Sequence, residues 1–402
     1  MSLPSYNEAL ETALRIVQPI AIRQRVMPEQ ALGRVLATDI VADRDLPPYN
    51  RSQMDGYAVV ASEVSRGVAM EVTDRIAAGS DGVTNQKQKP HTCVAIATGA
   101  PIPPQYDAVV QHELTDRGDL EGNKVTFHTA DVTVGKAIHT QGADATKGTV
   151  LIHSGAVIAA QHIGIAATVG VTDFAVVRKP KVAVLTSGDE VISPTQTPEP
   201  HQIRNGNGPM ITALFETFGC EVLQQIHVND DLVETKQAVS KALQICDLLV
   251  TVGGISVGEK DFFPQAFESA KVEFAVEGVA MQPGKPVVVG KSDRAVVFGL
   301  PGNPVSALAC SHLFGVPIVS KLLGTDPTLR WVQLPLATSV VPNKHRTSFR
   351  PCNIVDGKIN IPSWQGSGDL AHTSRTVGLA QLPMGSAELS AGELVAVLLY
   401  VN

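Results

Sequence analysis

Three glycine-rich stretches of the chain combine backbone freedom with hydroxyl and carboxylate side chains. They are TSGDE (186–190), VGGISVGEKD (252–261) and GLPGNPVSA (299–307). Glycine lets backbone N–H groups approach an anion without an intervening Cβ, and the serines add hydroxyl donors. The candidate anion-binding residues in these stretches are Thr186, Ser187, Gly188, Gly253, Gly254, Ser256, Gly258, Pro301, Gly302, Asn303, Pro304 and Ser306. None of the stretches matches GxxxxGK[ST] or GxGxxG, which disfavours an ordinary P-loop or dinucleotide fold.

Four carboxylates, Asp189, Glu190, Asp230 and Asp261, stand in or near these stretches. Carboxylates beside phosphate-binding loops commonly hold a Mg²⁺ ion that bridges phosphates. The alternative is helix capping, because Asp230 and Asp261 each stand just before an expected helix. For the pair Asp189 and Glu190 we favour the metal site, whereas for Asp230 both interpretations remain open.

The cation best placed for an anion is Lys285, in QPGKP (282–286). A lysine between glycine and proline is poorly explained as the solvated face of a helix or strand. Arg350 and Lys260 are lesser candidates.

A further carboxylate, Asp55, lies in SQMDGYA (52–58), shortly after Pro47 and Pro48. The prolines predict an extended approach to this segment rather than a helix. Asp-Gly by itself is typical of a turn, which would account for Gly56. Whether Asp55 also takes part in chemistry is left open by its local sequence.

Strands and helices alternate from Lys181 onward, and this alternation would position the glycine-rich stretches. Strands are expected at 181–185, 221–228, 247–252 and 295–299, and helices near Pro209, after Asp231-x-x-Glu234 and from Pro304. This pattern predicts a parallel, doubly wound α/β sheet. Because ligands bind at the carboxyl ends of such strands, the three stretches should meet there.

Other patterns predict three further parts of the chain. A capping box, Ser5-x-x-Glu8, opens a helix that Pro19 should end, and a second helix is expected over 156–168, closed by Gly170. The two helices are expected to pack together, so that short strands at 72–76, 92–97, 108–111 and 124–127 form an inserted β domain. After residue 326, short runs predict a small β-barrel. The expected domains are 1–45 with 135–178 (an elongated N-terminal linking domain), 46–134, 179–326 and 327–402.

Composition narrows the class of protein. The net charge of −7 argues against nucleic acid as a main partner, and 18% charged against 44% hydrophobic residues favours well-buried domains. We expect no secretory signal and no membrane span. The five cysteines lack CxxC spacing and the eleven histidines show no ligand pattern, so we expect no zinc site. The chain is expected to be a soluble cytoplasmic protein.

Taken together, the motifs resemble those of the MoeA family of molybdopterin molybdenumtransferases, whose animal relative is the E domain of gephyrin. SQMDGYA resembles the family's S-A-M-D-G-Y-A, and ATGAPIPPQYDAVVQHE (97–113) resembles T-G-A-P-x-P-x-G-A-D-x-V-V-x-x-E. GADATKG (142–148) resembles G-E-D-x-x-x-G, and TSGDE, GGISVGEKD, QPGKP and LPGNPVSA follow in family order. The resemblance covers nearly the whole chain.

The resemblance implies a MoaB-like α/β domain in an elongated homodimer of four-domain subunits, with small-molecule substrates. It implies insertion of molybdenum from molybdate into adenylylated molybdopterin, which an adenylyltransferase would supply, with Mg²⁺ assistance and release of AMP. By motif position, Asp55, Thr98 and Asp144 would face the site from the partner subunit, with Asp55, Asp144, Glu190 and Lys285 in catalytic roles. Arg350 and Ser367, the latter in QGSGDL, would be C-terminal contributions.

The chain departs from the family pattern at four places. His139 stands where the family often has Arg, Ala143 where it has Glu, and Gln282 where it frequently has Lys, and RNGN (204–207) replaces D-[ST]-N. Fewer cationic groups would weaken binding of molybdate or phosphate. The alternatives are therefore a divergent molybdopterin-binding or scaffold paralogue, or a molybdopterin adenylyltransferase.

Overall fold

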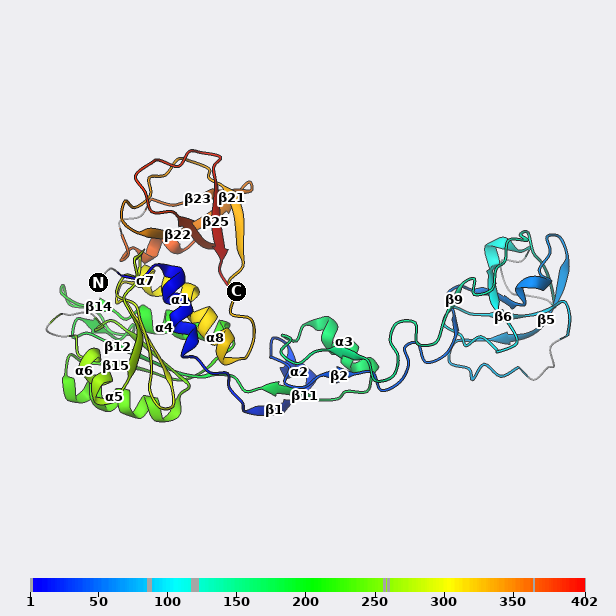
Figure 1. The fold of residues 1–402 in the computed structure, drawn as a ribbon, viewed down its shortest axis with the longest axis horizontal. Helices are drawn as coiled ribbons and strands as arrows, with labels where there is room; N and C mark the ends of the chain where they lie inside the picture. The colour runs from blue at the N-terminus through cyan, green and yellow to red at the C-terminus, as the bar shows by residue number, and fades with distance from the viewer. Residues whose placement is uncertain are drawn as a thin grey trace. The chain divides into compact units, whose positions relative to one another are not determined.

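The computed structural model describes residues 3–84, 89–116, 123–255, 258, 261–363 and 366–401. The chain forms two compact units (Figure 1). The larger unit comprises residues 1–37, 155–158 and 175–402, and the smaller unit comprises 38–154 and 159–174. The four domain boundaries given above stay predictions.

A six-stranded sheet forms the centre of the larger unit. Its order is β15 (Glu221–Val228), β12 (Lys181–Ser187), β16 (Leu248–Val252), β20 (Val296–Leu300), β19 (Val288–Lys291) and β17 (Glu273–Glu277). The first four strands are parallel, as the sequence predicted, whereas β19 runs antiparallel to both of its neighbours. The carboxyl ends of β12, β16 and β20 consequently lie at one edge.

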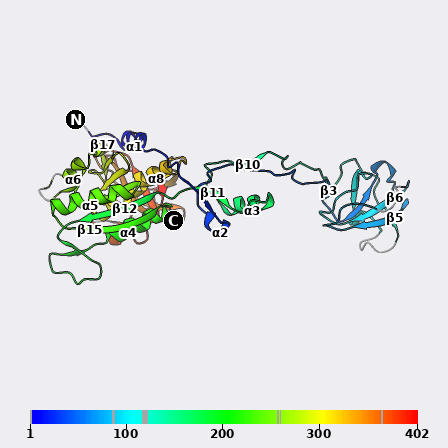
Figure 2. The same ribbon diagram turned by 90° about the horizontal axis from the view of Figure 1, so that it is seen from below.

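Helices cover both faces of this sheet. They are α4 (Asn207–Thr217), α5 (Leu232–Ile245), α6 (Phe263–Ser269), α7 (Pro304–Cys310) and α8 (Val316–Leu322). Figure 2 shows β12 and β15 between α5 and α4. Two separate hydrophobic clusters match this arrangement, because Val182 and Val184 pack on one face of β12 while Ala183 and Leu185 pack on the other. The sheet is therefore doubly wound.

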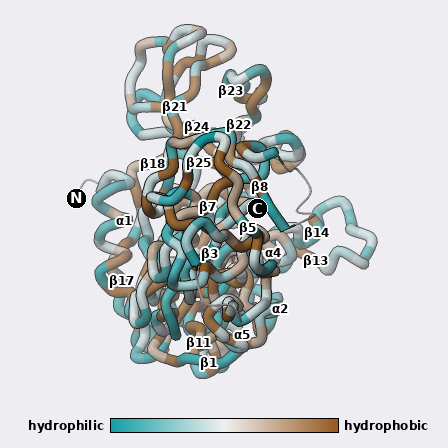
Figure 3. Tube along the Cα trace, turned by 90° about the vertical axis from the view of Figure 1, so that its right-hand side faces the viewer, coloured by the Kyte–Doolittle hydropathy of each residue, from teal (hydrophilic) through white to brown (hydrophobic). Residues whose placement is uncertain are grey.

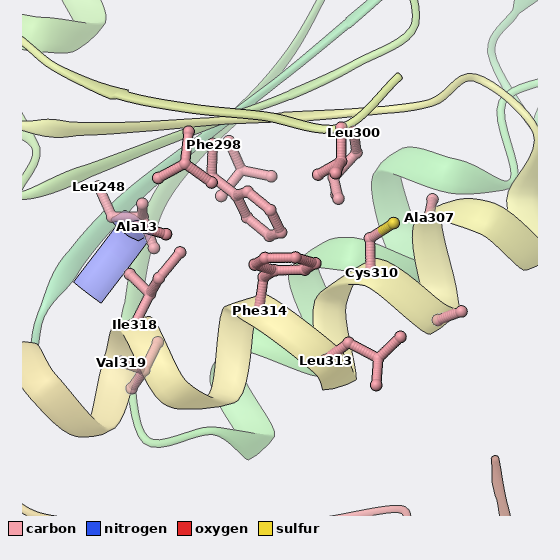
Figure 4. Close-up of a cluster of buried hydrophobic side chains, with 14 of the residues drawn as sticks. Ala13, Leu248, Phe298, Leu300, Ala307, Cys310, Leu313, Phe314, Ile318 and Val319 are labelled. Carbon is pink, nitrogen blue, oxygen red and sulfur yellow. The ribbon is translucent and has the colours of Figure 1, made fainter. Parts of the chain in front are cut away.

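The run Pro304–Leu322 joins α7 and α8 through a π-helical turn, Ser311–Gly315. Its length and apolar composition would allow it to cross a membrane, but 83% of its apolar window is buried inside the protein. Figure 4 shows Phe298 and Leu300 of β20 facing Phe314 and Cys310 of this run. It is a core helix of the larger unit.

The N-terminal helix α1 (Tyr6–Arg15) begins with the predicted capping box. It ends at Arg15, four residues before Pro19, with Ile16 as its C-cap, so the proline lies beyond the end of the helix. Tyr6 packs edge-on against Phe314 and Phe349, and its hydroxyl donates to the Leu313 carbonyl at 3.1 Å. The prediction that α1 packs with the helix around 156–168 is wrong, because that helix, α3 (Ala160–Thr168), belongs to the other unit.

The C-terminal part of the larger unit is the predicted small barrel. Its strands are β18 (Met281–Gln282), β22 (Thr347–Val355), β24 (Gly378–Leu382), β25 (Leu394–Leu399) and β21 (Trp331–Pro335), with β23 (Lys358–Asn360) beside β22. A bridge between Leu336 and Ile359 connects the end of β21 to β23, and so brings the two edges together.

The smaller unit holds a five-stranded sheet, in the order β7 (Ala108–Gln111), β4 (Gly56–Val59), β6 (Thr92–Ile96), β5 (Ala69–Ile76) and β8 (Lys124–Thr126). The predicted short strands are therefore confirmed. A two-stranded ladder pairs β3 (Arg51–Ser52) with β9 (Ile138–His139), and a second pairs β2 (Ile40–Val41) with β10 (Val150–Ile152). The first ladder places the residues around Asp55 beside those around His139.

Two further features concern a surface loop and the cysteines. The proline-rich segment between β13 (Val191–Ile192) and β14 (Ile203–Arg204) is an exposed polar loop, coloured hydrophilic over much of its length in Figure 3. All five cysteines are free and buried. Burial raises the pKa of the Cys93, Cys220, Cys246 and Cys352 thiols to about 12, so they behave as small apolar side chains.

Candidate active site

The three glycine-rich strand ends meet in one pocket of about 740 Å³ in the larger unit. The predicted residues that line it are Thr186, Ser187, Gly188, Glu190, Asp230, Gly253, Gly254, Asp261, Pro301, Gly302, Asn303 and Pro304. The prediction that these stretches gather at the carboxyl edge of the sheet is therefore confirmed as geometry.

Glycine is required where the loops touch. Gly253 and Gly254 have φ values of +84° and +59°, a region that side chains rarely adopt. A Cβ on Gly254 would lie 2.8 Å from Ser187 Oγ, and one on Gly302 would lie 3.4 Å from the Cα of Gly253. The loops after β12, β16 and β20 are thus held in direct contact.

Three carboxylates, Glu190, Asp230 and Asp261, line the pocket. Neither Asp230 nor Asp261 caps the helix that follows it, because Asp231 caps α5 and α6 begins after Phe262 without a side-chain cap. Asp261 instead accepts from Gly258 N at 2.9 Å. The capping interpretation of Asp230 and Asp261 is wrong.

Asp189 does not line the pocket but is joined to Asp230. The backbone N–H of Asp230 donates to Asp189 Oδ1 at 3.0 Å, and the N–H of Asp189 donates to Asp230 Oδ2 at 3.4 Å. Among the residues that the structure describes, no group of three or more potential ligand side chains is arranged to hold a metal ion. The donors are nevertheless hard carboxylate oxygens, which suit Mg²⁺, since that ion usually keeps several waters and takes one or two carboxylates plus substrate phosphates.

Two further predicted residues lie beside the pocket. The side chain of Asn303 donates to Ser367 Oγ at 2.8 Å, and Ser367 O accepts from Val305 N, so Ser367 supports the loop that ends β20. Lys285 is exposed and directly precedes Pro286, which lines the pocket. Within the described parts of the chain, Lys285 forms no ion pair.

Other predicted residues are not brought to this pocket. Ser306 is buried within α7. Arg350 lines a different pocket of about 340 Å³, where its guanidinium donates to Val341 O at 3.1 Å and burial lowers its pKa. Ser256 and Lys260 lie outside the described residues.

Asp55, Thr98 and Asp144 belong to the smaller unit. Asp55 is exposed, and its Oδ1 accepts from Thr98 N at 2.8 Å. The attribution of Gly56 to a turn is wrong, because Gly56 begins β4 and a Cβ there would lie 2.1 Å from Val110 O. The glycine is required by close strand pairing, and Asp55 lies directly before the first residue of β4.

Asp144 is held by His139, one of the departures from the family pattern. His139 Nε2 lies 2.9 Å from Asp144 Oδ1, and Arg51 Nη2 lies 3.2 Å from His139 Nδ1. Because arginine only donates, Nδ1 accepts and Nε2 carries the proton that points at Asp144. A neutral imidazole supported by Arg51 thus contacts this carboxylate.

Sequence reasoning missed several residues of the pocket. Asn205 is buried, accepts from Gly208 N at 2.8 Å, and donates to Thr186 Oγ1 at 2.8 Å. Asn207 donates to Gly302 O at 2.7 Å. Both lie in RNGN, which was interpreted only as a departure from the family motif, although an asparagine shortly before an expected helix is a capping signal that points to Asn205.

Family comparisons agree with this arrangement. The MoeA N-terminal region (domain I and II) matches residues 4–170, a probable molybdopterin binding domain matches 183–321, and the MoeA C-terminal region (domain IV) matches 333–400. A molybdopterin molybdenumtransferase from Staphylococcus epidermidis is 34% identical over 411 residues, covering 98% of this chain and 95% of the relative. The chain belongs to the MoeA family. Its membership makes it a transferase of molybdenum cofactor biosynthesis, acting on a molybdopterin-related substrate.

Other relatives support the same assignment. A molybdopterin molybdenumtransferase from Staphylococcus aureus is 32% identical over 399 residues, covering 95% of this chain and 94% of the relative. A crystal structure of a molybdopterin biosynthesis MoeA protein from Pyrococcus horikoshii has a TM-score of 0.86 at 27% identity, covering 99% of this chain and all of that one. The predicted multidomain fold, with its MoaB-like α/β domain, is confirmed.

Proposed function

We propose that this MoeA-family chain inserts molybdenum from molybdate into adenylylated molybdopterin and releases AMP, in a Mg²⁺-dependent reaction. The observation that carries the proposal is the convergence of three glycine-rich strand ends and three carboxylates in one pocket. Backbone approach at Gly253, Gly254 and Gly302 suits a phosphate group.

The charge of the pocket supports a divalent cation. Glu190, Asp230 and Asp261 line it, against a single described cationic side chain in its wall, Arg204. Three carboxylates facing one arginine would repel a phosphoanhydride, so we assign one or two of them, Asp230 among these, to hold Mg²⁺ together with waters and phosphate oxygens, with Asp189 orienting Asp230. When bound, Mg²⁺ would withdraw electron density from the phosphoanhydride.

We assign Lys285 as the cationic side chain that attracts the anionic groups of the substrates. This lysine stands exposed beside Pro286 and follows Gly284, where a side chain does not fit because a Cβ would lie 2.4 Å from Cys310 Sγ. Lys285 would attract molybdate or the developing phosphate charge. Ser367 would keep the Asn303 loop in place.

We propose further that the protein works as a homodimer and that the partner's smaller unit completes each site. The support is that the remaining motif residues gather in the smaller unit. The backbone N–H of Thr98 donates to Asp55, and the β3–β9 ladder places the hydrogen-bonded pair His139 and Asp144 near the segment that contains Asp55. In this proposal Asp55 and Asp144 supply charge to the reacting groups. The protein is assigned to the cytoplasm, where its five free cysteines would stay reduced.

The decisive experiment supplies purified protein with adenylylated molybdopterin, molybdate and Mg²⁺, and measures AMP release and molybdenum incorporation. The expected result is release that requires both molybdate and Mg²⁺. Release that proceeds without molybdate would refute insertion. Adenylylation of molybdopterin from ATP would instead identify an adenylyltransferase, and a folded dimer without either activity would identify a scaffold.

A mixing experiment tests the shared site. Asp55→Asn and Lys285→Ala are each expected to be inactive alone, but their mixed dimers would contain one intact site. Randomly mixed subunits should then recover about a quarter of the wild-type rate. No recovery in verified mixed dimers would refute the sharing.

A further inference from the structure

His227, on β15, contacts the pocket wall without lining the pocket. Its Nδ1 lies 3.0 Å from Thr186 Oγ1, and its Nε2 lies 3.1 Å from the carbonyl oxygen of Gly188. Parallel pairing places Thr186 directly opposite His227 on the neighbouring strand. The imidazole therefore joins the end of β12 to the loop that follows it.

The direction of each hydrogen bond in this network can be assigned. The Gly188 carbonyl can only accept, so His227 Nε2 carries the proton and Nδ1 is an acceptor. The Thr186 hydroxyl consequently donates to Nδ1, while its oxygen accepts from Asn205 Nδ2 at 2.8 Å. The Thr186 hydroxyl and the His227 Nε2–H thus each have one assigned acceptor, Nδ1 and the Gly188 carbonyl.

Two hydrogen bonds to the Gly188 carbonyl, from His227 Nε2 and from Val191 N, both at 3.1 Å, hold one peptide plane. In a planar trans peptide the C=O and N–H groups point in opposite directions. Holding the Gly188 carbonyl toward His227 therefore directs the Asp189 N–H the other way, toward Asp230 Oδ2 at 3.4 Å. Gly188, with φ of +129°, offers little steric resistance to rotation of this peptide.

We propose that His227 is a positioning residue that orients the Asp230 carboxylate through the Gly188–Asp189 peptide. Without the imidazole, this peptide keeps only the hydrogen bond from Val191 N and can rotate about it, which breaks the contact of the Asp189 N–H with Asp230 Oδ2. The reciprocal contact of Asp230 N with Asp189 Oδ1 would be lost with it. The inference rests on the proposed function only in assigning Asp230 to Mg²⁺.

The test uses the full chain with His227→Asn, His227→Phe and His227→Gln. Asparagine is too short to reach Gly188 and phenylalanine cannot donate, whereas glutamine places an N–H near the position of Nε2. Gln224→Leu, on the same strand and outside the network, is the matched control. Melting curves establish whether each variant is folded. If the Phe variant is unfolded, the Asn variant alone tests the loss of the donor to the Gly188 carbonyl.

Two measurements are made on each variant. Crystal structures report the direction of the Gly188 carbonyl, and calorimetry reports the affinity for ADP with Mg²⁺, a probe that carries a phosphoanhydride. The Asn and Phe variants should show a rotated peptide and about tenfold weaker binding, the value of one lost hydrogen bond. The Gln variant and the control should resemble the wild type in both.

The outcomes separate the inference from the proposed function. An unrotated peptide and unchanged Asp230 in the Asn and Phe variants would overturn the positioning role. If the wild type fails to bind ADP with Mg²⁺, the phosphate pocket is refuted, while the carbonyl direction in the crystal structures still decides the role of His227.

Discussion

Acid should destabilise the larger unit through a single buried histidine, His312. It lies in the π-helical turn, 1% exposed, stacked on Tyr400 with ring centroids 4.4 Å apart. Its Nδ1 is buried without a hydrogen-bond partner in the described structure. Burial lowers the pKa of His312 from 6.5 to about 4.

The native and unfolded states take up a proton at His312 in different pH ranges, so the free energy of unfolding depends on pH. Between pH 6.5 and 4 the unfolded chain binds a proton at this residue that the native chain does not bind. Stability from the neutral imidazole is therefore fully present above pH 6.5 and is lost as the pH falls through this range. The full loss is about 3 kcal/mol, of which about 2 kcal/mol is lost by pH 5.

The assay is urea unfolding of wild type and His312→Phe at pH 7 and pH 5. Phenylalanine keeps the stacking on Tyr400 and removes the buried nitrogen, so we expect equal or higher stability at pH 7. The difference between the two pH values should shrink by about 2 kcal/mol in the variant. His345→Phe, at an exposed position, is the control. An unchanged pH dependence in His312→Phe would refute the reasoning.

Three further predictions concern the candidate site. Asp55→Asn should leave the melting temperature within about 2 °C, because an amide oxygen still accepts from Thr98 N, while AMP release falls at least about a hundredfold; unchanged turnover would return Asp55 to a purely structural role. Gly56→Ala should unfold the smaller unit or destabilise it by more than about 3 kcal/mol in urea unfolding, because its Cβ would overlap Val110 O; wild-type stability would contradict the strand-pairing requirement. Asp230→Asn should raise the Mg²⁺ concentration needed for half-maximal AMP release about tenfold or more, and an unshifted Mg²⁺ titration would exclude Asp230 as a ligand.

Local patterns predicted the elements well because each pattern has a local cause. The capping box at Ser5 and Glu8 and the cap at Asp231 fix helix starts through hydrogen bonds within three residues. The strand β15 was predicted with its observed bounds because apolar β-formers run between two breaks, Gly219 and Asp230. The packing of α1 was predicted wrongly, because an apolar helix face does not specify which surface covers it.

Sequence alone determined the glycine-rich loops, the four parallel strands of the α/β sheet and the family, but it did not predict the antiparallel strands β19 and β17. Parallel strands bring their carboxyl ends to one edge, so the convergence of TSGDE, VGG and LPGN could be inferred before any coordinates were known. The tertiary structure decided the roles that depend on distance. It showed that residue 56 must be glycine because a Cβ there would lie 2.1 Å from Val110 O. It also showed that Asp230 is hydrogen-bonded to Asp189 and that Arg350 lies in another pocket. Those facts depend on residues far apart in the chain, and only the folded backbone sets the distances between them.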